Sequence, residues 1–248
     1  MNPPVIPPFR RVATSFPVAF FHSFLTAGAI ITIFPAASIC RGEALFLEEF
    51  SNQVSGLNQN LSTIGWEAYG NASADDLTLA KGPEVTSGIF VASGAGNPAS
   101  PIGFLACGLM NDLAFNEYAA VKTGLQLDNP SKFSWRMHGT PGSQIDVRLL
   151  VKIGDNWYAS SKEFIPEALG GPGAFPAVAS ADCEVMLPFS RKAEDWRHFQ
   201  LEPGSALALG DALKVDLPNS AVIGVGLYVA TPGQTPSMLR LDTLEAFR

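Results

Sequence analysis

Hydrophobic and polar residues alternate over short stretches of this chain, as they do in half-buried β-strands. The alternation is clearest in residues 131–138, where Phe133, Trp135 and Met137 share one face and polar side chains occupy the other. Glycine and proline recur every few residues, and long runs with the 3.6-residue period of an amphipathic helix are missing. Residues 116–125 fit either a short helix or a strand. The stretches predicted as strands are residues 45–50, 87–92, 131–138, 145–153, 157–159, 196–201, 221–230 and 238–247.

Turn residues between these stretches predict hairpins. Residues 139–143 (Gly-Thr-Pro-Gly-Ser) join the strands 131–138 and 145–153, and Gly-Asp-Asn at 154–156 joins the second of these to 157–159. Short strands separated by turns in this way are typical of an antiparallel β-sandwich or barrel.

The N-terminal part of the chain has the layout of a secretory signal. Arg10 and Arg11 precede an uncharged apolar run from 16 to 34, and small residues follow at 36–38. The cleavage positions that fit are after Ser38 and after Ala44. We therefore interpret residues 1–44 as a signal peptide and expect a secreted, extracytoplasmic protein. The alternative is an uncleaved membrane anchor, because about 20 apolar residues suffice to span a bilayer.

Removal of the signal makes the remaining chain more acidic. The whole chain has a net charge of −7, and residues 1–44 contribute a positive share through Arg10, Arg11 and Arg41. Proteins that bind nucleic acid need a basic patch on one face, so a nucleic-acid partner is not expected. The 204 residues from 45 to 248 suit a single domain with its own core.

The chain has three cysteines, and Cys40 lies near the end of the predicted signal segment. The other two, Cys107 and Cys183, lie in the part that follows it. In an oxidising compartment Cys107 and Cys183 can form a disulfide. The alternative is a pair of buried thiols, because both lie among apolar residues. The spacing of Cys107 and Cys183 along the chain does not distinguish a disulfide from two free thiols.

Patterns of catalytic residues are missing from the sequence. Glycoside hydrolysis needs two carboxylates at a set separation, and the Glu-x-Asp-x-x-Glu run of sandwich hydrolases does not occur. The Gly-x-Ser-x-Gly pattern of a serine nucleophile does not occur either. We therefore expect a protein that is not an enzyme.

Several short motifs together resemble a known group of folds. An acidic opening strand at 47–50 is followed by Gly-Trp at 65–66, by Gly-x-x-Trp-Tyr at 154–158 and by a closing Leu-Arg-Leu-Asp-Thr-Leu at 239–244. This closing run is similar to Arg-Ile-Asp-Asn-Phe, the common final strand of the galactose-binding-like and concanavalin-like jelly rolls, which include many carbohydrate-binding modules. The resemblance implies an all-β fold, an antiparallel jelly-roll β-sandwich, over residues 45–248.

The resemblance also implies a structural calcium site. In related jelly rolls the first and last strands lie near each other and often hold this ion. The resemblance maps the acid of the first strand onto Glu48 or Glu49 and the acid of the last strand onto Asp242. Carboxylate and carbonyl oxygens are the ligands that calcium takes. The alternative is that these acids are edge charges that discourage pairing between molecules.

Candidate ligand-binding residues come from aromatic and polar positions. Trp157 and Tyr158 follow a turn and alternate, so one of them must face outward. Arg136 and His138 lie on the polar face of the predicted hairpin, where they would be near Asp146 and Arg148. Together these side chains would form a polar groove suited to a glycan. The alternative is an ordinary solvated sheet face with cross-strand ion pairs.

These observations predict a secreted, non-catalytic β-sandwich that binds carbohydrate, with a polysaccharide or a cell-surface glycan as partner. We expect contact with a membrane only through the N-terminal segment, if this segment is not cleaved. One alternative is a structural or surface-matrix protein without a small ligand. A second is a polysaccharide-active lyase or hydrolase.

Overall fold

The computed structural model describes ten ranges of the chain, all within the compact unit Cys40–Arg248. They are residues 42–51, 58–73, 76–79, 88–92, 103–109, 117–139, 144–166, 184–201, 207–231 and 237–248. Almost all of the predicted signal segment lies outside them. Within the described ranges, no helix is both long and apolar enough to cross a membrane.

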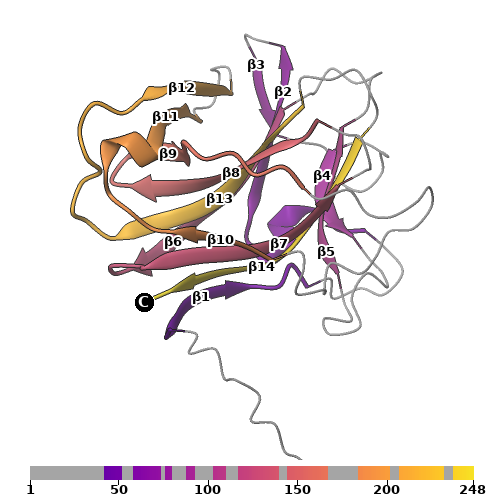
Figure 1. The fold of residues 1–248 in the computed structure, drawn as a ribbon. Helices are drawn as coiled ribbons and strands as arrows, with labels where there is room; N and C mark the ends of the chain where they lie inside the picture. The colour runs from indigo at the N-terminus through magenta and orange to yellow at the C-terminus, as the bar shows by residue number, and fades with distance from the viewer. Residues whose placement is uncertain are drawn as a thin grey trace, which may run out of the picture. The chain divides into compact units, whose positions relative to one another are not determined.

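The described residues form two antiparallel sheets (Figure 1). The six-stranded sheet has the order β10-β7-β14-β5-β4, with β1 also paired to β14. Its strands are β1 (Ala44–Glu48), β4 (Gly88–Ala92), β5 (Phe104–Leu109), β7 (Lys132–Gly139), β10 (Glu184–Pro188) and β14 (Ser237–Phe247).

The eight-stranded sheet has the order β12-β11-β9-β8-β13-β6-β2-β3. Its strands are β2 (Glu67–Ser73), β3 (Asp76–Leu79), β6 (Glu117–Leu127), β8 (Asp146–Ile153), β9 (Asn156–Ser160), β11 (Trp196–Gln200), β12 (Ala208–Ala212) and β13 (Val222–Ala230). Two short 3-10 turns, η1 (Leu61–Ile64) and η3 (Ala193–Asp195), precede β2 and β11. The predicted all-β, antiparallel sandwich is confirmed, and residues 117–125 of the ambiguous stretch belong to the strand β6.

The main core lies between the two sheets. The apolar face of β7, which carries Phe133 and Trp135, belongs to the same buried cluster as Leu149 and Val151 of β8. The Trp135 ring meets Phe164 edge-on, with the ring centroids 4.8 Å apart. The alternating pattern of residues 131–138 therefore identified the core-facing side chains of β7 correctly.

The predicted hairpin between 131–138 and 145–153 is wrong. Strand β7 pairs with β14 and β10, whereas β8 pairs with β13 and β9, so the two strands belong to different sheets. Two strands that each have one apolar face can bury these faces as neighbours in one sheet or from opposite sheets of a sandwich. The alternation of apolar and polar residues is the same in both arrangements. The second predicted hairpin is confirmed, because Ile153 of β8 is in register with Asn156 of β9.

The eight-stranded sheet is also apolar on its outer face, which points away from the main core. Leu150, Trp157, Phe199 and Tyr228 are buried there in a second cluster, the outer cluster. Phe199 and Tyr228 come from β11 and β13, with two strands between them, yet their ring centroids are 5.2 Å apart. The two rings therefore reach toward each other over the intervening strands.

Candidate binding pocket

The structure places the predicted site residues in separate parts of the sandwich. Arg136 of β7 is in register with Asp242 of β14, and His138 with Arg240, on the outer face of the six-stranded sheet. His138 and Asp242 are both buried. The predicted groove formed by Arg136, His138 and Asp146 is therefore wrong, because Asp146 belongs to the other sheet.

Glu48 lies elsewhere, in a polar network at the end of β1. One carboxylate oxygen, Oε2, accepts from Trp66 Nε1 and Lys122 Nζ at 2.8 Å each, and Oε1 accepts from Phe50 N at 3.1 Å. Lys122 Nζ also donates to the Ile64 carbonyl at 3.2 Å. Glu48 thus connects the first strand to β6 and to the η1 turn.

The calcium site stays a prediction. Glu49 is exposed, and Asp242 Oδ1 accepts from the backbone N–H of Thr243 at 2.8 Å. In the described ranges, no group of three or more His, Cys, Asp or Glu side chains is placed to hold a metal ion. The ion pair with Lys122 accounts for the position of Glu48 without a metal.

Removal of the Glu48 carboxylate is expected to lower the free energy of unfolding. Glu48→Ala leaves three donors without their acceptor in a partly buried place, which we expect to cost about 2 kcal/mol. Glu43→Ala is the matched control, because its ion pair with Arg248 is exposed and such pairs contribute about 0–1 kcal/mol. Urea unfolding measures both, and equal losses would contradict the role given to Glu48.

Cys107 is a free thiol that lies fully buried in β5. Burial raises the pKa of this thiol well above its ordinary value. This agrees with the buried-thiol alternative for Cys107. Cys183 lies outside the described residues, so the disulfide is not supported and stays a prediction.

Trp157 and Tyr158 point to opposite faces of β9, as their alternation predicts. Trp157 faces away from the main core but is only 8% exposed, because it belongs to the outer cluster. Tyr158 faces the main core and is 7% exposed. The outward position of Trp157 therefore does not make it a surface side chain.

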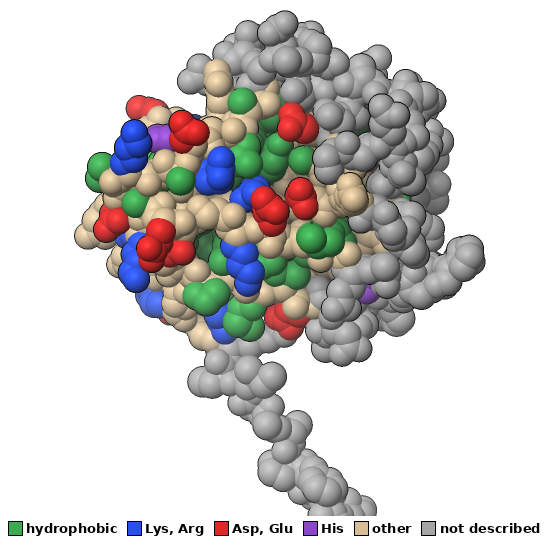
Figure 2. Space-filling model, turned by 45° about the horizontal axis from the view of Figure 1, so that its top comes forward, with side chains coloured by type: hydrophobic (Ala, Val, Ile, Leu, Met, Phe, Trp, Pro, Cys, Tyr) green, Lys and Arg blue, Asp and Glu red, His purple; other side chains and the backbone are tan. Residues whose placement is uncertain are grey.

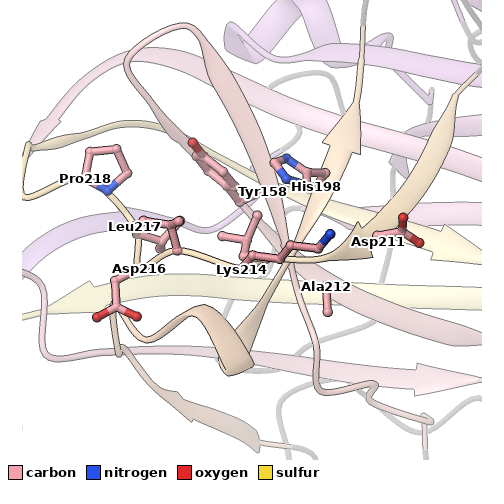
Figure 3. A pocket seen from close by; sticks show the side chains of 10 residues that line it. Tyr158, His198, Asp211, Ala212, Lys214, Asp216, Leu217 and Pro218 are labelled. Carbon is pink, nitrogen blue, oxygen red and sulfur yellow. The ribbon is translucent and has the colours of Figure 1, made fainter.

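Tyr158 lines a pocket of about 500 Å³ at the end of the core (Figure 3). One side of the pocket comes from β9 and β11, and the other from the segment that leads from β12 toward β13. The lining residues are Tyr158, His198, Asp211, Ala212, Leu213, Lys214, Val215, Asp216, Leu217 and Pro218. Figure 3 shows the rings of Tyr158 and His198 next to each other, facing this segment.

The ring pair is positioned by the strand register. His198 of β11 is directly opposite Tyr158 of β9, so both side chains project from the same face of the sheet. Their ring centroids are 6.3 Å apart and the planes are tilted by 38°. Tyr158 is buried and His198 is exposed, so the pair runs from the edge of the core out to solvent.

The segment 211–218 is held in place by hydrogen bonds. Leu213 N donates to the Trp196 carbonyl at 3.0 Å, and Leu217 N donates to the Arg191 carbonyl at 2.7 Å. Asp216 Oδ1 accepts from Ala193 N at 2.9 Å. The wall formed by this segment is thus fixed to β11 and to the η3 turn, and the pocket is preformed.

The pocket has an apolar bottom and a polar rim. Leu217 is buried beside Tyr158 in the main core, whereas Val215 is 78% exposed. Asp211, Lys214 and Asp216 are exposed. On the face that Figure 2 shows, acidic and basic side chains of the described residues are interspersed.

Sequence reasoning found Tyr158 but missed His198. The predicted strand 196–201 contains the signal, because alternation puts His198 on the same face as the buried Trp196. A histidine on a core-facing position marks the place where the core ends and solvent begins. The acidic and basic residues of 211–218 carry no comparable pattern.

Comparisons with known proteins find likeness in fold. No protein-family model matches the chain, and a search of curated proteins finds no match to it. The K2 cleaved adhesin domain of Lys-gingipain matches with 13% identity and a TM-score of 0.45, over 82% of this chain and 99% of that one.

Carbohydrate-binding modules are among the other matched structures. A family 11 module of a Clostridium thermocellum cellulosomal cellulase has 10% identity and a TM-score of 0.41, over 83% of this chain and 96% of that one. A module in complex with β-1,4-galactotriose has 11% identity and a TM-score of 0.34, over 79% and 98%. At these identities the likeness concerns the β-sandwich alone and says nothing of a ligand.

Proposed function

We propose that this chain binds a carbohydrate in the pocket between β9, β11 and the segment 211–218. The observation that carries the proposal is the pair of rings, Tyr158 and His198, beside a rim of carboxylates and an ammonium group. The matched carbohydrate-binding modules share the sandwich fold, but a fold does not fix a function, so the proposal rests on the pocket.

The chemistry of the lining suits a sugar. Sugar rings present C–H groups on their faces, which pack against aromatic side chains such as Tyr158 and His198. Their hydroxyl groups donate to carboxylates and accept from ammonium groups, and Asp211, Lys214 and Asp216 offer both at the rim. The volume of about 500 Å³ falls within the ordinary range for small-molecule sites.

The proposal includes export and binding without catalysis. Export rests on the pattern of residues 1–44, and N-terminal sequencing of the mature protein tests it. A binding role without catalysis rests on the sequence, in which the carboxylate and serine patterns of sandwich hydrolases are missing.

A glycan array probed with the full chain tests the proposed function. We expect binding to at least one class of oligosaccharide, and we expect His198→Ala to weaken it about tenfold, which corresponds to about 1.4 kcal/mol. His198 is exposed, so its replacement is expected to leave the melting temperature nearly unchanged.

Gln200→Ala is the matched control for His198→Ala. Gln200 is exposed and lies on the same strand, two residues along, but does not line the pocket. Its replacement is expected to leave binding unchanged. The proposal fails if no glycan binds, or if the two variants bind alike.

A further inference from the structure

We propose that the pocket selects neutral glycans over acidic ones, and that Asp211 is a specificity-determining residue. This inference rests on the proposed function. The inference adds the chemical class of the ligand to the proposed function: a chain of uncharged sugars, without uronic acid or sulfate groups.

The charges around the pocket are the first argument. Among its lining residues are two carboxylates, Asp211 and Asp216, and one ammonium group, Lys214. These three side chains together contribute a net charge of −1. The chain as a whole has the same sign, with a net charge of −7.

The placement of these charges is the second argument. Figure 3 shows Asp211 and Asp216 at opposite ends of the lining segment, with Lys214 between them. An anionic group on a sugar that fills the pocket therefore approaches a carboxylate at either end. Sugar hydroxyls at the same positions instead donate hydrogen bonds, and bonds to an ionised acceptor are among the stronger ones.

The two carboxylates differ in what else they do. Asp216 accepts the Ala193 N–H at 2.9 Å and so helps to hold the pocket wall. Asp211 lies exposed on the edge strand β12, and no hydrogen bond or ion pair to it is seen among the described residues. Asp211 is thus the carboxylate that can be changed without loosening the wall.

The expected size of the selection follows from Coulomb's law. Two unit charges about 4 Å apart in water interact by about 1 kcal/mol, which is about a fivefold change in affinity. Because Asp211 is exposed, salt screens this interaction. The preference for neutral glycans is therefore expected to shrink at high ionic strength.

The test is an array that carries each neutral oligosaccharide beside its uronic acid counterpart of the same linkage and length. The full chain is expected to bind neutral members at least about fivefold more strongly at low ionic strength. Asp211→Asn is expected to reduce this ratio about fivefold, and Lys214→Met to increase it. Asp155→Asn, an exposed aspartate of the β8–β9 turn outside the pocket, is the control.

The outcomes separate this inference from the proposed function. The inference is overturned if the chain binds the acidic oligosaccharides as strongly as their neutral counterparts, or more strongly. The proposed carbohydrate binding is not affected by that result. A ratio that Asp211→Asn does not change overturns the role of Asp211. Absence of binding to both arms of the array overturns the proposed function, and this inference with it.

Discussion

Gly226→Ala is expected to destabilise the chain by about 3 kcal/mol, the upper part of the range for overpacked positions. A Cβ atom on Gly226 would lie 2.5 Å from the Ala120 carbonyl oxygen and 2.7 Å from Val121 Cγ1. The carbonyl belongs to β6, the paired neighbour of β13, so it cannot move away without disturbing the strand ladder. Urea unfolding measures the loss.

Gly224→Ala is the comparison within the same strand. There the new Cβ would lie 3.0 Å from the Lys122 carbonyl oxygen and 3.1 Å from Cη2 of Trp157, which are tight but less severe contacts. We expect a smaller loss, about 1 kcal/mol. If Gly226→Ala costs no more than Gly224→Ala, the close approach of β13 and β6 is not what requires glycine.

Tyr158→Leu is expected to weaken glycan binding about 30-fold, which corresponds to about 2 kcal/mol, the size typical of a central aromatic contact. Leucine keeps an apolar side chain in the main core but removes the ring that faces the sugar. Titration of the full chain with the glycan that binds best measures the change.

Tyr158→Phe separates the ring from the hydroxyl group. Phenylalanine keeps the ring beside His198, so we expect it to retain most of the affinity that leucine loses. Melting temperatures of both variants show that each has folded. Equal binding by the leucine variant and the unchanged chain would exclude Tyr158 from the site.

The sequence predicted the strands better than their partners. The shared face of Phe133, Trp135 and Met137 is the core face, because a period of two residues follows directly from strand geometry. Pairing was predicted from turn residues alone, and this failed for β7 and β8. Strands β7 and β8 belong to different sheets, and local turn residues do not reveal that choice.

The site was harder to predict than the fold, because it is assembled from distant segments. About 40 residues separate Tyr158 from His198, and more than 10 separate His198 from the segment 211–218. Only the strand order β12-β11-β9 brings these parts together. Glu48 was singled out through the resemblance, but its partners are distant in sequence: Trp66 lies between η1 and β2, and Lys122 lies in β6. The resemblance that suggested calcium there could not show the ion pair between Glu48 and Lys122.

The most direct test of the central claim is nuclear magnetic resonance of the full chain during titration with the oligosaccharide that binds best on the array. We predict that the ring signals of Tyr158 and His198 shift most, together with the backbone amides of 211–217. Shifts concentrated instead on Trp157 and Phe199, in the outer cluster, or on Arg136 and His138 would contradict the assignment of the pocket as the binding site.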